Sequence, residues 1–124
     1  MIRTLLSSLV LAASVAGAVL AQDSAPVYCG SFTPFSIRAS AAGKTADARA
    51  SQAMDIINKY LGGKTGNVSV RPDGKQARLL LNGETVAVVT PADAAAERQP
   101  NAISVAQKWS RALAKAFNES KAQK

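Results

Sequence analysis

Apolar and polar residues change their spacing several times along the chain, and each change predicts a different structural element. From Thr45 onward the apolar residues fall on one face of a helix, at Ala50, Ala53, Met54, Ile57 and Leu61. Thr45 is suited to cap the start of this helix, and Asp47 lies in its first turn. Gly62 and Gly63 are expected to supply the left-handed residue that ends it.

Alternating apolar residues in the middle of the chain predict three strands. Val68 and Val70 alternate with polar residues in the first of them. Pro72-Asp73-Gly74 has the composition of a turn. The stretch "QARLLLNGETVAVVT" places Asn82-Gly83 between two apolar runs, which is a strong hairpin signal. We therefore expect an antiparallel meander.

Shorter signals flank these central elements. Two β-prone pieces, Val27-Tyr28-Cys29 and Phe35-Ser36-Ile37, predict a strand or hairpin that Pro34 restricts to a sheet edge. Thr90 is positioned to cap a short helix that begins at Pro91, with Asp93 completing an approximate capping box.

A final helix follows Asn101, its expected cap. Its apolar sector contains Val105, Trp109, Ala112, Leu113, Ala116 and Phe117. We expect Trp109 to pack on the sheet.

This order of elements predicts an α+β fold. Short N-terminal strands lead through a crossover helix to a three-stranded antiparallel meander, and C-terminal helices pack on one sheet face. We assign residues 27–119 to a single domain, residues 22–26 to a flexible leader and residues 120–124 to a polar tail.

The N-terminal residues have the pattern of a secretory signal peptide. Arg3 precedes an uncharged stretch from Leu5 to Leu20, and small residues lead to an expected cleavage site after Ala21. A membrane anchor is the alternative, but the stretch is shorter than the ~20 residues that a spanning helix needs. We therefore expect a periplasmic or secreted protein with no transmembrane segment in the mature chain.

Charge adds a candidate binding surface. The formal net charge is +7, or +6 without Arg3, which favours anionic partners. On the last helix, Lys108, Arg111 and Lys115 gather on one side, and we treat them as candidate residues for binding an anion or a partner. The alternative is that they form an ordinary solvated helix face.

Two Gly-Lys-Thr triplets raise the question of nucleotide binding. A P-loop also requires a glycine five positions before the Gly-Lys pair. "LGGKTG" has Asn58 at that position, and "AAGKTA" has Arg38 there. We therefore predict no nucleotide site, and interpret Gly43 as loop and Thr45 as a helix cap.

The remaining chemistry is sparse. The sequence contains no histidine and one cysteine, so we expect no metal site, no cofactor and no enzymatic activity. A carboxylate pair brought together from distant segments remains an alternative. Cys29 is interpreted as a half-buried strand thiol or, alternatively, as the site of an intermolecular disulfide. Aromatic residues at expected core positions disfavour nucleic acid as a partner.

Three stretches carry a resemblance to a known family: "VYCGSFTPFSIRA", "NGETVAVVTPADA" and "AISVAQKWSRALAKAF". Together they resemble the small extracytoplasmic region that precedes the membrane part of certain bacterial small-conductance mechanosensitive channel proteins. The resemblance covers residues 27–118. It implies a periplasmic, non-catalytic accessory module without channel activity, in which the framework positions are Val88, Val89, Thr90, Ala92, Asp93 and Trp109.

These observations leave three functional hypotheses. The first is a stand-alone module that docks on an envelope protein, through an edge strand near Val27 to Ile37. The second is a binder of anionic envelope polymer or lipid through Lys108, Arg111 and Lys115. The third is a small hydrolase that uses two carboxylates not apparent from the sequence.

Overall fold

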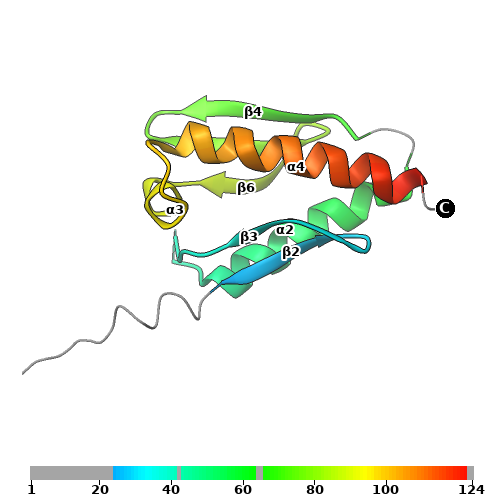
Figure 1. The fold of residues 1–124 in the computed structure, drawn as a ribbon, viewed down its shortest axis with the longest axis horizontal. Helices are drawn as coiled ribbons and strands as arrows, with labels where there is room; N and C mark the ends of the chain where they lie inside the picture. The colour runs from blue at the N-terminus through cyan, green and yellow to red at the C-terminus, as the bar shows by residue number, and fades with distance from the viewer. Residues whose placement is uncertain (1–23, 42, 64–65, 123–124) are drawn as a thin grey trace, which may run out of the picture.

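The computed structural model describes residues 24–41, 43–63 and 66–122, and it has the expected α+β class (Figure 1). The elements are β2 (Ala25–Cys29), β3 (Phe32–Ile37), α2 (Ala46–Leu61), β4 (Val68–Asp73), β5 (Gln76–Leu81), β6 (Glu84–Val89), α3 (Pro91–Ala96) and α4 (Ala102–Ala122). The predicted signal peptide and its cleavage site lie outside the described residues. Within the described ranges, no helix combines the length and the apolar character needed to cross a membrane.

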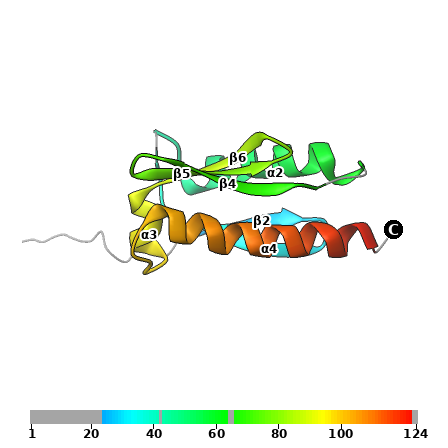
Figure 2. The same cartoon turned by 90° about the horizontal axis from the view of Figure 1, so that it is seen from above.

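The strands form two sheets, and each sheet is extended by a helix. β2 and β3 form an antiparallel hairpin, and β4, β5 and β6 form the expected meander in the order β4-β5-β6. In Figure 2 the meander and α2 form one layer, while the hairpin, α3 and α4 form the other. The hairpin packs on α2, and α4 packs on β4 and β5. The core therefore lies between two mixed layers.

Turn residues explain how the meander is connected. Asn82 and Gly83 both have positive φ, 54° and 84°, as a type I′ hairpin turn requires, which confirms the predicted hairpin. The predicted turn at Pro72-Asp73-Gly74 begins too early, because β4 continues through Asp73 and the turn consists of Gly74 and Lys75. Gly74 has the expected positive φ, 62°. Pro72 is tolerated because β4 is an edge strand.

Two features of the first half of the chain depart from regular geometry. The β2–β3 register shifts between Val27 and Cys29, opposite the segment of β3 that contains Pro34. At the end of α2, Gly62 has φ −81° and Gly63 also lacks a positive φ, so the predicted left-handed end of this helix is wrong. The last turn instead tightens, with the Gly63 N–H donating to the Tyr60 carbonyl at 3.0 Å.

The predicted helix caps are present. The Thr45 hydroxyl accepts from the Ala48 N–H at 3.1 Å, and the Asn101 side chain accepts from the Ser104 N–H at 2.9 Å. At the start of α3, Thr90 and Asp93 form the reciprocal capping box. Each side chain satisfies a backbone N–H that the helix itself leaves without a partner.

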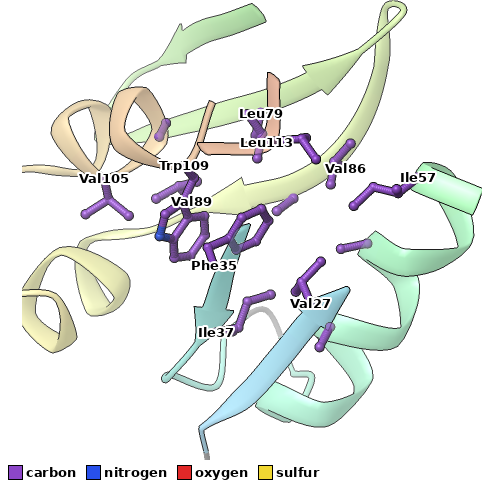
Figure 3. Packing of buried hydrophobic residues seen from close by; sticks show 14 of the residues in the cluster. Val27, Phe35, Ile37, Ile57, Leu79, Val86, Val89, Val105, Trp109 and Leu113 are labelled. Atoms are coloured by element: carbon purple, nitrogen blue, oxygen red, sulfur yellow. The ribbon is translucent and has the colours of Figure 1, made fainter. Parts of the chain in front are cut away.

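An aromatic stack joins the two ends of the chain in the core. The ring of Trp109 on α4 stacks on that of Phe35 on β3, with centroids 4.5 Å apart and planes 9° apart (Figure 3). Trp109 thus packs on the two-stranded hairpin, whereas the prediction referred to the sheet that contains the meander. Cys29 is completely buried in the same cluster rather than half-buried.

A buried ion pair connects α2 to the start of α3. Arg49 donates from Nη1 to Oδ1 of Asp93 at 2.9 Å and from Nη2 to Oδ2 at 2.7 Å, so the contact is bidentate. The same guanidinium donates to the carbonyls of Ala39, after β3, and Val88, in β6. Asp93 also accepts from the Thr90 N–H at 2.8 Å. Four segments of the chain therefore meet at one charge pair.

Replacing Arg49 tests this arrangement. We expect Arg49→Ala to lower the free energy of unfolding by about 3–5 kcal/mol, because Asp93 would keep a buried charge without its partner. Urea denaturation followed by Trp109 fluorescence measures this change. The control is Arg78→Ala, which breaks an exposed pair with Asp73 and should cost less than about 1 kcal/mol. Equal losses in the two variants would contradict the role of the buried pair.

Gly66 provides a second test, of close packing. A Cβ atom at this position would overlap the ring of Phe117, which is completely buried in the core. Gly66→Ala should therefore lower the free energy of unfolding by about 1–3 kcal/mol. Gly62→Ala is the matched control, since a Cβ there meets no atom within 4 Å and φ is ordinary for alanine. The same denaturation experiment compares the two, and a neutral Gly66→Ala would refute the close contact.

The buried thiol provides a third test. Burial raises the pKa of Cys29 from its ordinary 9.0 to about 11, so the thiol stays protonated at neutral pH. At about pH 8, the thiolate fraction should be on the order of a hundredfold lower in the folded protein than in urea. We expect iodoacetamide to react correspondingly slowly with the native protein. Equal rates with and without urea would show that the thiol is accessible.

Candidate binding site

The three basic residues singled out in the sequence are exposed on α4. Lys108, Arg111 and Lys115 are all on the solvent side of the helix, while Val105, Trp109, Leu113 and Phe117 on its other side are buried. Arg111 and Lys115 have no acidic side chain within ion-pair distance among the described residues, although Glu119 is exposed further along the helix. The three residues therefore form a basic stripe, which we call the α4 stripe.

Lys108 differs from the other two residues of the stripe because it belongs to an ion-pair network. Its Nζ donates to Oε1 of Glu97 at 3.1 Å, and Arg38 Nη1 donates to Oε2 of the same carboxylate at 2.9 Å. Only 5% of the Glu97 side chain is exposed, against 50% for Arg38 and 53% for Lys108. One nearly buried carboxylate therefore holds two half-exposed cations.

Three different elements position this network. Arg38 directly follows β3, Glu97 is the C-terminal cap of α3, and Lys108 lies on the second turn of α4. Arg98, the residue after Glu97, has φ 57°, which lies in the left-handed region. The chain turns at this residue from α3 toward α4. The network therefore fixes the connection between α3 and α4 against the end of β3.

A groove runs beside this network between β3 and α4. It has a volume of about 240 Å³ and is lined by Thr33, Pro34, Phe35, Ser36, Arg38, Glu97, Lys108, Trp109 and Ala112. The stacked rings of Phe35 and Trp109 lie at its base, with Ala112 half-exposed beside them. Arg38 and Lys108 supply positive charge at its rim. We call this feature the β3–α4 groove.

The structure brings two separately predicted features together at this groove. The N-terminal hairpin was a candidate docking edge, and the basic helix face was a candidate anion site. β3 and Lys108 contribute to one groove, whereas Arg111 and Lys115 are absent from its lining. Sequence reasoning missed Arg38 and Glu97, because neither follows a hydrophobic period or a recognisable motif.

The first Gly-Lys-Thr triplet lies beside other hollows. The backbones of Ala41 and Lys44 exchange two hydrogen bonds of 3.0 Å, and Gly43, between them, has φ 76°. Lys44 Nζ donates to Oε1 of Gln52 at 2.7 Å. A hollow of about 170 Å³ lies between these residues and the Thr85–Val88 segment of β6. The Lys44 ammonium is therefore directed to α2 in this structure.

A second surface network has perturbed pKa values. Glu84 accepts from Lys59 Nζ at 2.9 Å and from the Tyr60 hydroxyl at 2.8 Å, and these hydrogen bonds, that of Lys59 first, lower the pKa of Glu84. The hydrogen bond to Glu84 raises the pKa of both Lys59 and Tyr60. Tyr60 is thus kept protonated, which is the opposite of activation as a base or nucleophile.

Other chemical groups are dispersed in the described part of the chain. The residues described contain no cluster of three or more Cys, Asp or Glu side chains that could hold a metal ion. Among the described residues, Glu97 is the one carboxylate that lines the β3–α4 groove. The hollow beside Thr85–Val88, and a further hollow lined by Ser40, Ala41, Gly43, Lys44 and Thr45, have no carboxylate among their described lining residues. The absence of a cofactor and of enzymatic activity stays a prediction.

Comparison with known proteins identifies a family without a stated function. No curated protein and no solved structure matches the chain. Residues 26–120, which extend from β2 to the last turns of α4, match the family described as "Domain of unknown function (DUF8459)". This match includes every residue of the β3–α4 groove and of the α4 stripe. The chain belongs to this family of domains of unknown function.

Proposed function

We propose that the protein is a secreted or periplasmic, non-catalytic module that docks on an envelope protein through the β3–α4 groove. The observation that carries this proposal is the groove itself, with two half-exposed cations at its rim and an aromatic base. The proposed location rests on the N-terminal sequence pattern. The resemblance to an extracytoplasmic module of channel proteins supports the same accessory role.

Size favours a macromolecular partner over a small substrate. Pockets that enclose small molecules usually have volumes of roughly 300–1,000 Å³ and bury most of the ligand. The groove is smaller, at about 240 Å³, and its two cations remain half in solvent. A groove of this kind accommodates one or two side chains of a partner whose remaining surface contacts the rim.

The hairpin also offers a second docking edge. β3 has β2 on one side and α4 on the other, whereas β2 pairs with β3 alone among the described strands. Tyr28, on β2, is 49% exposed. A partner bound at the groove could therefore extend its contact along the hairpin toward Tyr28.

An anionic envelope polymer or lipid is the second candidate. It is favoured by Arg111 and Lys115, which are exposed and lack acidic partners among the described residues. Binding of this kind depends on screened charges, and the Debye length is about 8 Å at physiological ionic strength. Its affinity should therefore fall steeply with salt.

A pull-down from native envelope extract separates the two candidates. The bait is the mature chain, residues 22–124, at low and moderate salt, beside two variants. Ala112→Trp fills the groove without changing charge, and Arg111→Glu with Lys115→Glu reverses the unpaired part of the α4 stripe. The control, Arg71→Glu with Lys75→Glu, makes the same charge change at exposed residues of the β4–β5 hairpin.

For a docking module, we expect a specific protein that is retained at both salts and lost with Ala112→Trp alone. Retention that disappears with salt and with the α4-stripe variant, but not with the control, would support the polymer or lipid instead. Specific retention that is unaffected by both variants would contradict both sites. Failure to retain any specific protein would count against docking.

A further inference from the structure

We infer, on the basis of the proposed docking function, that the β3–α4 groove recognises an acidic side chain in an extended segment of the partner. Arg38 and Lys108 would bind the carboxylate of this side chain. The neighbouring apolar part of the segment would contact Pro34 and Ala112 above the stacked rings of Phe35 and Trp109.

Glu97 holds the two cations in place before any partner arrives. Each of its oxygens accepts from a different cation, and the carboxylate is nearly buried, so both side chains lose freedom in the unbound protein. Ordering of this kind lowers the entropic cost of binding. Both cations still have N–H donors for a partner. Arg38 has five and Lys108 has three, and each donates one to Glu97 among the described residues.

The charge of the network indicates which anion it suits. Two cations and one carboxylate leave a net charge of +1 at the rim. A single carboxylate neutralises this charge and gains charge-assisted hydrogen bonds. A phosphate or sulfate polymer would bring several charges close to Glu97, whose own negative charge opposes them. The groove therefore favours a peptide carboxylate over a polyanion.

The shape of the groove indicates an extended segment. Its β side is formed by four consecutive residues of a strand, Thr33 to Ser36, and its other side by α4. Side chains of an extended segment alternate between two faces, so that every second residue points toward the groove. An acidic residue at the rim, with apolar residues on the alternate face, matches this geometry.

Fluorescence polarisation with labelled model peptides tests the inference on the mature chain. The probe is the acetylated and amidated peptide VEVEVEV, and the comparison peptides are VQVQVQV and VKVKVKV. We expect saturable binding of the Glu peptide, at least about tenfold tighter than that of the Gln peptide, since a hydrogen bond between charged groups is about twice as strong as one between neutral groups. The Lys peptide should not bind.

Variants place the binding on the molecule. Arg38→Ala with Lys108→Ala should weaken binding of the Glu peptide about tenfold or more. Because this change leaves Glu97 without partners, Ala112→Trp serves as a second variant that retains the network and should also abolish binding. Arg71→Ala with Lys75→Ala removes two exposed cations elsewhere and should change the affinity by less than about twofold. Circular dichroism verifies that each variant is folded.

The outcomes separate this inference from the docking function. Equal affinity for the Glu and Gln peptides, or no saturable binding, would overturn recognition of an acidic side chain. With that peptide result, the pull-down still tests docking by itself. If the Ala112→Trp variant failed to retain the envelope protein there, the groove would remain the docking site, and its ligand would be something other than an acidic side chain. If the Arg71→Ala, Lys75→Ala control lost as much affinity as the Arg38→Ala, Lys108→Ala variant, the peptide would be attracted by the overall positive charge of the protein. That result would overturn the groove as the binding site. Inorganic polyphosphate that bound more tightly than the Glu peptide, through Arg111 and Lys115, would overturn the preference for a carboxylate.

Discussion

The bidentate contact between Arg49 and Asp93 is the interaction on which the arrangement of the elements depends. Among the described strands, none of one sheet pairs with a strand of the other, so strand pairing does not join the two sheets. Arg49 supplies this connection, because it reaches the chain after β3, the end of β6 and the start of α3 from α2. Such a buried pair stabilises a fold only if its hydrogen bonds are well made, and here all four N–H groups on the two Nη atoms have acceptors.

The functional surface depends on this framework through α3. Asp93 fixes the start of this short helix, and Glu97 forms its end. The position of the Glu97 carboxylate, and therefore of Arg38 and Lys108, follows from where Asp93 anchors the helix. The buried pair and the rim of the groove are thus two ends of a single structural element, although one is hidden and the other faces solvent.

Local signals predicted the elements well, and long-range contacts account for what they missed. Asn82-Gly83, the Thr90–Asp93 box and the Asn101 cap act within a few residues, so the sequence displays them directly. The continuation of β4 through Pro72 was missed, because a proline is tolerated in a strand only at a sheet edge, and the sequence does not show that β4 is an edge strand. The separation into two sheets and the partners of Arg49 and Glu97 depend on residues distant in the sequence. The candidate site was therefore predicted in part, as an exposed stripe without its groove.

The stack of Phe35 on Trp109 has a consequence for how the protein is made. The two rings come from opposite ends of the domain, and both are buried against the elements between them. A chain synthesised from its N-terminus has the hairpin, α2 and the meander before α4 emerges. Until then, Phe35 lacks the ring of Trp109, and β4 and β5 lack the helix that packs on them. Folding of the domain must therefore be completed after synthesis of its last helix, so apolar surface stays exposed for as long as α4 is missing.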